Sequence, residues 1–184
     1  MGLHTVLKAL KKEEHSMRIL VLGLDNSGKT TIVKRFIGED IHSISPTLGF
    51  NTVTTFHNGF RINLMDVGGQ KTIRAYWKNH FEETDAVIWV IDSADKIRLE
   101  ETHDELHAVL QAERLAGASL LVCANKQDIE GALSVEEITD VLQLNNIERR
   151  HWLCACVSAV TGRGLKEAIN WVVSDVANRV YQFE

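Results

Sequence analysis

The stretch MRILVLGLDNSGKT occupies residues 17–30 and decides the fold. Its first half, MRILVLG, is a continuous apolar run that ends in glycine, as a buried parallel strand does. Its second half, GLDNSGKT, matches G-x-x-x-x-G-K-[ST] and leads into a helical segment that Gly38 closes. Gly23 and Gly28 let backbone N–H groups approach phosphate oxygens, and the helix N-terminus adds positive charge. Lys29 can neutralise β- and γ-phosphates and Thr30 can ligate Mg²⁺, so we predict a nucleoside phosphate site.

The sequence NKQD, which begins at Asn125 directly after an apolar run, indicates the base. Guanine presents N1–H and an exocyclic amine side by side, and the Asp128 carboxylate can accept both. Adenine offers neither donor there and would leave the aspartate unpaired, which is costly. Asn125 can brace the loops, and the stem of Lys126 can cover the face of the base. Backbone N–H groups at Ser158 and Ala159 can reach the guanine O6, so we predict guanine specificity.

The sequence DVGGQ, which begins at Asp66, adds groups suited to a third phosphate. Asp66 is placed to hold a water on Mg²⁺, and the N–H of Gly69 can reach a γ-phosphate. Gln70 can orient an attacking water for in-line transfer. Thr47 can supply a second hydroxyl to Mg²⁺ when the γ-phosphate draws in its loop. A contact that exists only with the third phosphate predicts a conformational switch.

Strand and helix signals alternate along the rest of the chain. The Asn58-Gly59 pair is a strong hairpin signal between two of the strands. Alternation of this kind predicts an α/β fold with a mostly parallel, six-stranded sheet and helices on both faces. The expected strands cover 17–23, 51–57, 60–66, 86–92, 119–125 and 152–158, and the expected helices cover 28–38, 97–114, 134–142 and 164–180.

Composition excludes several other classes of protein. The 184 residues, 45% hydrophobic and 24% charged, fit one globular domain. A net charge of −5 argues against a nucleic-acid surface, and no run approaches the roughly 18 apolar residues of a membrane span. Cys123, Cys154 and Cys156 lie in apolar runs, which favours buried thiols over a zinc site. We expect a cytoplasmic protein, and leave open that it also associates with the cytoskeleton or centrosome.

Taken together, GLDNSGKT, SPTLGFN, DVGGQ, NKQD and SAVTG resemble the ADP-ribosylation-factor branch of the small GTPases across essentially the whole chain. The resemblance implies one P-loop GTPase domain over 16–184, a GTP/GDP cofactor with Mg²⁺, and slow GTP hydrolysis that Gln70 catalyses. No arginine is placed by motif to act on the transition state, so an activating protein is expected to complete the site. The implied metal ligands are Thr30, Thr47 and, through water, Asp66. The implied nucleotide-binding residues are Gly23, Asp25, Asn26, Ser27, Gly28, Lys29, Thr30, Thr31, Thr47, Gly69, Asn125, Lys126, Asp128, Ser158 and Ala159.

The chain begins MGLHTVLKALKKEE, which predicts an amphipathic helix over residues 1–15. Its apolar stripe, with lysines on the other side, lies within about 100° of a helix surface. The resemblance implies that this helix packs on the GDP-bound body and leaves it when the hairpin at 51–66 slides along the sheet. A constitutively docked helix is the alternative. Gly2 could carry a myristoyl group, but Val6 stands where the pattern requires Ser or Thr, so we expect weak or no membrane binding.

The resemblance also implies a set of partners. Phe50, Met65 and His80 occupy the positions that effectors read in the GTP state, and Met65 and His80 replace the aromatic residues usual in this branch. Implied partners are carriers of lipid-modified cargo, a tubulin-folding cofactor, and activating and exchange proteins, all acting on a monomer. Two other functions remain open. One is a membrane-recruited vesicle-trafficking GTPase, and the other is a nucleotide-binding module that never cycles.

Overall fold

The computed structural model describes residues 14–181, which contain a six-stranded sheet in the order β2-β3-β1-β4-β5-β6. Strand β2 is antiparallel to β3, and the other neighbouring strands are parallel. This arrangement confirms the predicted sheet, including its single antiparallel strand. The strands are β1 (Ser16–Leu22), β2 (Phe50–His57), β3 (Phe60–Val67), β4 (Ala86–Asp92), β5 (Ser119–Asn125) and β6 (Trp152–Cys156).

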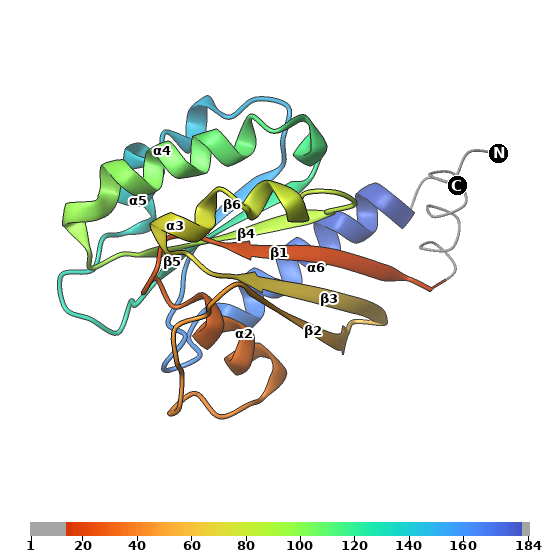
Figure 1. Ribbon diagram of the computed structural model, residues 1–184, viewed down its shortest axis with the longest axis horizontal. Helices are drawn as coiled ribbons and strands as arrows, with labels where there is room; N and C mark the ends of the chain where they lie inside the picture. The colour runs from red at the N-terminus through yellow and green to blue at the C-terminus, as the bar shows by residue number, and fades with distance from the viewer. Residues whose placement is uncertain (1–13, 182–184) are drawn as a thin grey trace.

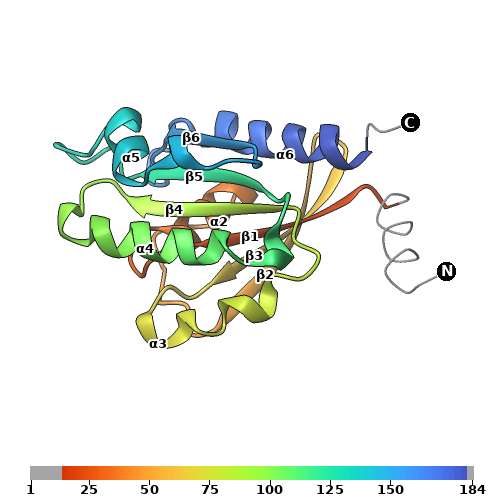
Figure 2. The same cartoon turned by 90° about the horizontal axis from the view of Figure 1, so that it is seen from above.

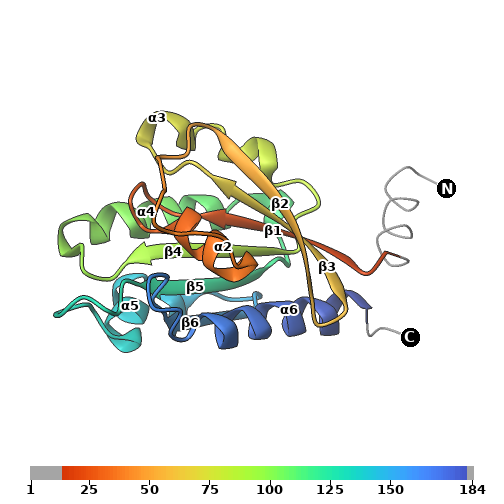
Figure 3. The same ribbon diagram turned by 90° about the horizontal axis from the view of Figure 1, so that it is seen from below.

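Helices cover both faces of the sheet, as predicted (Figure 1). Helix α4 stands in front of the sheet in Figure 2, and α2 stands in front of it in the opposite view of Figure 3. The α-helices are α2 (Lys29–Ile37), α3 (Lys71–Arg74), α4 (Leu99–Leu110), α5 (Val135–Val141) and α6 (Leu165–Tyr181). Short 3₁₀ turns are η1 (Trp77–His80), η2 (Lys96–Arg98), η3 (Glu113–Leu115) and η4 (Leu144–Asn146).

Each sheet face carries its own apolar core. Side chains of α2 and α6 pack on one face, and side chains of α4 and α5 pack on the other. Cys123 and Cys154 are buried within these cores, and Cys156 is half-buried. Burial raises the pKa of the Cys154 thiol to about 12 and raises that of Cys123 as well. The predicted role of these cysteines as core thiols therefore fits the structure.

The predicted hairpin turns at Asn58 and Gly59, which both have positive φ, at 49° and 82°. A two-residue turn of this kind matches the twist of the flanking strands and suits an Asn-Gly pair. His57 pairs with Phe60 directly beside the turn, and the register continues to Phe50 opposite Val67. This hairpin adds β2 at the edge of the sheet next to β3.

Two predicted elements differ from the structure by more than one residue at an end. The helix expected over 97–114 is shorter, because Ala112 is extended (ψ 120°) and separates α4 from η3. The last strand ends at Cys156, before 158, because the Ser158 N–H donates to the Arg163 carbonyl and the chain turns.

The predicted N-terminal helix lies, up to residue 13, outside the described residues. Residues 14 and 15 form a turn, and β1 begins at Ser16. The division of the chain into a switch helix over 1–15 and a GTPase domain over 16–184 stays a prediction.

Candidate nucleotide-binding site

The carboxyl ends of the parallel strands meet at one edge of the sheet, where ligands bind in open α/β folds. The loops after β1 and β3 come together there with the segment that precedes β2. They enclose a cleft of about 290 Å³. The cleft is lined by Asp25, Asn26, Gly28, Lys29, Thr30, Thr31, Ile44, Ser45, Pro46, Thr47, Gly68, Gly69 and Gln70.

The glycines of the phosphate loop are required by the protein itself as well as by phosphate. Gly23 has φ 141°, and a Cβ there would lie 2.2 Å from the Val90 carbonyl oxygen. Gly28 has φ 95°, and its Cβ would lie 2.3 Å from the Asn125 amide nitrogen. From the sequence, these glycines were expected only to let phosphate oxygens approach the backbone. The loop is thus packed against β4 and β5 at distances that only glycine permits.

Lys29 is buried at the start of α2, and its ammonium donates to the Leu24 carbonyl at 2.7 Å. Burial lowers the pKa of this amine to about 8, although the nearby Asp66 and Asp25 carboxylates oppose that shift. A buried cation at the N-terminus of a helix is suited to an anionic ligand. Lys29 lines the cleft, and its contact with β- and γ-phosphates stays a prediction.

Three oxygen-bearing side chains meet beside Lys29. The Thr30 hydroxyl donates to Asp66 Oδ2 at 2.6 Å and lies 2.9 Å from the Thr47 hydroxyl. Asp66 Oδ1 is buried with no hydrogen-bond partner among residues 14–181. Burial also raises the pKa of the Asp66 carboxyl. The hydrogen bond from Thr30 and the charge of Lys29 partly offset this rise. Hydroxyl and carboxylate oxygens are ligands that Mg²⁺ prefers, so these residues fit the predicted ion.

The DVGGQ turn lies directly against the phosphate loop. The Asp25 N–H donates to the Gly69 carbonyl at 3.1 Å, and a Cβ on Gly69 would lie 2.4 Å from the Asp25 nitrogen. The Gly68 N–H donates to the Gly49 carbonyl at 2.8 Å, which holds the segment before β2 to the same turn. Gln70 follows as the N-cap residue of α3 and lines the cleft.

Asn125 braces two loops, as predicted. Its buried amide donates to the Ser27 carbonyl at 2.9 Å and accepts from the Ala159 N–H at 3.0 Å. The Ala159 N–H, predicted from the sequence to reach guanine, instead donates to Asn125 in the structure. The difference follows from packing, because Asn125 at the end of β5 lies beside the loop after β6.

The other residues that the sequence predicts to bind the base, Asp128, Ser158 and Lys126, lie in the loops that follow β5 and β6. The Ser158 hydroxyl donates to Asp128 Oδ1 at 2.5 Å, which aligns the carboxylate. Lys126 has φ 68°, and its ammonium pairs with Asp92 Oδ2 at 2.6 Å. This contact with the end of β4 was not predicted from the sequence. It holds the Lys126 side chain across the loops that follow β4 and β5.

The predicted effector positions share one surface. The rings of Phe50 and His80 lie 4.8 Å apart, and Phe50 is 55% exposed. The Arg18 guanidinium lies behind them, 4.0 Å from Met65 Sδ and 3.5 Å from the His80 carbonyl. Burial and the Arg18 charge together lower the pKa of His80.

A charged cluster that the sequence did not predict lies beside the phosphate loop. Arg98 pairs with Asp25 at 2.7 Å, and the buried Arg74 pairs with Glu101 at 2.8 Å and Glu105 at 3.0 Å. The spacing of 98, 101 and 105 along one helical face was the available signal. Nothing in the sequence pattern connects that face with the phosphate loop.

Comparison with known proteins identifies the family. The sequence matches the ADP-ribosylation factor family over residues 3–176. The chain belongs to the ADP-ribosylation factor family. It is 56% identical over 184 residues to ADP-ribosylation factor-like protein 2 of Drosophila melanogaster, with 100% of both chains covered. It is 55% identical over 181 residues to the protein of that name in Dictyostelium discoideum, with 98% of both covered.

A solved structure shares the fold. The Arl6 BBS3 small GTPase of Trypanosoma brucei, with the nucleotide analogue GppNp bound, superposes with a TM-score of 0.81 at 30% identity. The match covers 89% of this chain and 98% of that one. As a member of the ADP-ribosylation factor family, this protein is a GTP-binding switch that binds GTP or GDP with Mg²⁺ and hydrolyses GTP.

Among residues 14–181, the structure contains no helix with the length and hydropathy of a membrane span.

Substituting Asn125→Ala should weaken GDP binding by about tenfold or more. The change leaves the buried Ser27 carbonyl and Ala159 N–H without their partner, and each unsatisfied buried group costs about 1–3 kcal/mol. The measurement is the dissociation constant of a fluorescent GDP analogue. Asn146→Ala, at an exposed asparagine on η4, is the control. Equal affinities of Asn125→Ala and the control would contradict the bracing role.

Substituting His80→Phe should reduce the loss of stability in acid. The lowered pKa keeps His80 neutral in the folded state, while the unfolded chain takes up a proton near pH 6.5. The contribution of His80 to the free energy of unfolding is therefore complete above pH 6.5 and declines as the pH falls below that value. Thermal unfolding with GDP at pH 7.5 and 5.5 measures the effect. Between pH 7.5 and 5.5, the melting temperature of the His80→Phe variant should fall less than that of the wild type. The control His42→Gln, at an exposed histidine, should fall as much as the wild type. An equal fall for His80→Phe and the wild type would refute this role of His80.

Proposed function

We propose that this GTPase is a soluble switch that releases lipid-modified cargo from carrier proteins and acts on a tubulin-folding cofactor. The observation that carries the switch is the 2.9 Å contact between the Thr30 and Thr47 hydroxyls beside Asp66. Thr47 belongs to the segment before β2, so a ligand held by these three residues also controls the position of that segment.

Each site residue has a proposed role in this cycle. The phosphate-loop backbone and Lys29 bind the phosphates, and Thr30, Thr47 and, through water, Asp66 would hold Mg²⁺. The ion supplies charge neutralisation to the phosphates when it is bound. The Gly69 N–H reaches the terminal phosphate, and Gln70 orients the attacking water. Hydrolysis is slow without an activating protein.

Base recognition is proposed to depend on the second group of loops. The Asp128 carboxylate accepts hydrogen bonds from guanine, and Ser158 keeps it aligned. Asn125 holds the phosphate loop to the Ala159 segment, and the Lys126 stem covers the base. The hydrogen bonds described above support these roles, because they leave the residues in fixed orientations at one edge of the sheet.

The proposal of a soluble switch rests on two observations. Relatives at 56% and 55% identity carry the name ADP-ribosylation factor-like protein 2, and the resemblance to this branch implies carriers and a tubulin-folding cofactor as partners. Val6 departs from the myristoylation pattern. We therefore propose a cytoplasmic monomer whose 1–15 helix faces protein rather than lipid.

The test uses the full-length protein loaded with GDP or GppNHp and a carrier protein that holds a fluorescent farnesylated peptide. The GppNHp form should release the peptide and the GDP form should not. Phe50→Ala should abolish release, because this exposed ring contacts His80 on the effector surface. Phe56→Ala is the matched control, since Phe56 is also exposed on β2 but lies near the other end of that strand.

Two outcomes would refute the proposal. The first is release that does not depend on the nucleotide, or no release in either state. The second is strong sedimentation of the GppNHp form with anionic liposomes, which would favour the membrane-recruited trafficking GTPase.

A further inference from the structure

The phosphate loop of this protein carries an acidic side chain beside the site for an anionic ligand. Asp25 lines the nucleotide cleft and also a second cavity of about 20 Å³ on the side of α4. A carboxylate that turned toward the cleft would repel phosphate oxygens at short range. The direction in which Asp25 is held therefore bears on nucleotide binding.

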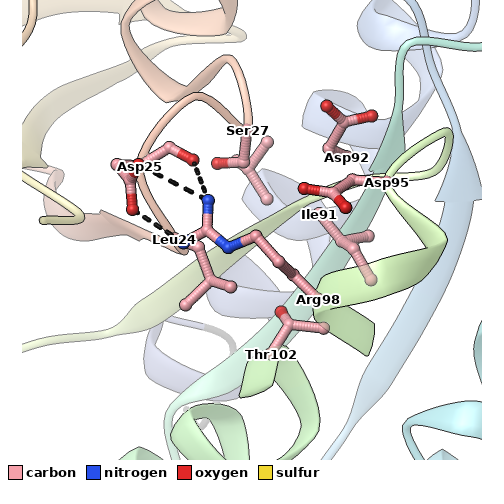
Figure 4. A pocket seen from close by; sticks show the side chains of 9 residues that line it. Leu24, Asp25, Ser27, Ile91, Asp92, Asp95, Arg98 and Thr102 are labelled. Atoms are coloured by element: carbon pink, nitrogen blue, oxygen red, sulfur yellow. Dashed lines mark hydrogen bonds and ion pairs between the residues drawn. The ribbon is translucent and has the colours of Figure 1, made fainter. Parts of the chain in front are cut away.

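Arg98 holds the Asp25 carboxylate from the α4 side (Figure 4). One guanidinium nitrogen, Nη2, donates to Oδ1 at 2.7 Å. The other, Nη1, donates to Oδ2 at 3.4 Å and to the Asp25 carbonyl at 3.3 Å. The fork thus contacts both carboxylate oxygens and the loop backbone, a geometry that only arginine offers. The Arg98 hydrogen bond lowers the pKa of Asp25, which keeps this carboxyl ionised.

Surrounding groups fix the position of Arg98. Its Nε donates to Glu101 Oε2 at 2.9 Å, and the other oxygen of Glu101 accepts from Arg74 at 2.8 Å. Arg74 is buried, donates to the Gly69 carbonyl at 2.8 Å, and lies 3.5 Å from Asp25 Oδ1. The cluster therefore joins the phosphate loop, the DVGGQ turn and α4.

We propose that Arg98 is a positioning residue that restrains the Asp25 carboxylate on the α4 side of the phosphate loop and so permits binding of the third phosphate. Without Arg98, the carboxylate can turn into the cleft beside Lys29. The affinity for GTP then falls more than the affinity for GDP, because GTP brings an additional negatively charged phosphate to the side of the loop that Gly69 faces. The effect of Arg98 on nucleotide choice then exists only while residue 25 is charged.

A double-mutant cycle tests this dependence on charge. Arg98→Ala, Asp25→Asn and the double variant are compared with the wild type in full-length protein. The dissociation constants for GDP and GppNHp are measured at one fixed Mg²⁺ concentration. Arg98→Ala should weaken GppNHp binding by about tenfold and GDP binding by about threefold or less, and this roughly threefold difference is of the size expected for one partly exposed charge pair. In the Asp25→Asn background, the same substitution should change neither constant by more than about twofold.

Lys96→Ala is the matched control, because it removes a positive charge from the same 3₁₀ turn at an exposed position. It should leave both dissociation constants unchanged. A merely structural role for Arg98 would weaken GDP and GppNHp equally and would persist in the Asp25→Asn background. That result, or an Arg98→Ala protein with wild-type affinities, overturns the proposal, as does an equal shift in Lys96→Ala. Thermal unfolding of each variant with GDP establishes that the compared proteins are folded.

Discussion

The buried amide of Asn125 holds together the two halves of the nucleotide site. It donates to the Ser27 carbonyl in the phosphate loop and accepts from the Ala159 N–H in the loop after β6. Gly28 approaches this amide so closely that a residue with a Cβ atom does not fit at that position. The sheet places these loops at one edge, but strand pairing alone leaves them without a direct connection. One buried side chain therefore couples the part of the site suited to phosphate with the part suited to a base.

A second set of contacts connects the site with the mobile elements expected of a switch. Thr30, Thr47 and Asp66 come from three different segments and share one hydrogen-bonded cluster. The Gly68 N–H bonds to the Gly49 carbonyl nearby, so the segments before β2 and after β3 also contact each other directly. Because β2 and β3 form one hairpin, a change at this hydrogen-bonded cluster reaches both of its strands.

Charge around the phosphate loop is balanced by residues outside the motif. Arg74 is buried, and the carboxylates of Glu101 and Glu105 compensate its charge. Removing one of these carboxylates leaves the charge of the buried Arg74 less fully compensated, which is destabilising. The cluster thus connects helix α4 with the phosphate loop, although α4 carries no recognised motif.

The sequence by itself determined the local structure and the chemistry of the site. Continuous apolar runs identified the buried strands, because parallel strands covered on both faces exclude polar residues. Asn58 and Gly59 identified the hairpin through their tolerance of positive φ. The spacing of the phosphate-loop and NKQD motifs likewise assigned the groups suited to phosphate, metal and base.

Only the tertiary structure decided which partners those groups have. The Ala159 N–H bonds to Asn125, Lys126 pairs with Asp92, and Asp25 pairs with Arg98 across 73 positions of sequence. Such contacts depend on the register of neighbouring strands and on where a helix packs. A motif records the residues of one continuous segment, whereas an ion pair forms wherever folding brings opposite charges within a few ångströms.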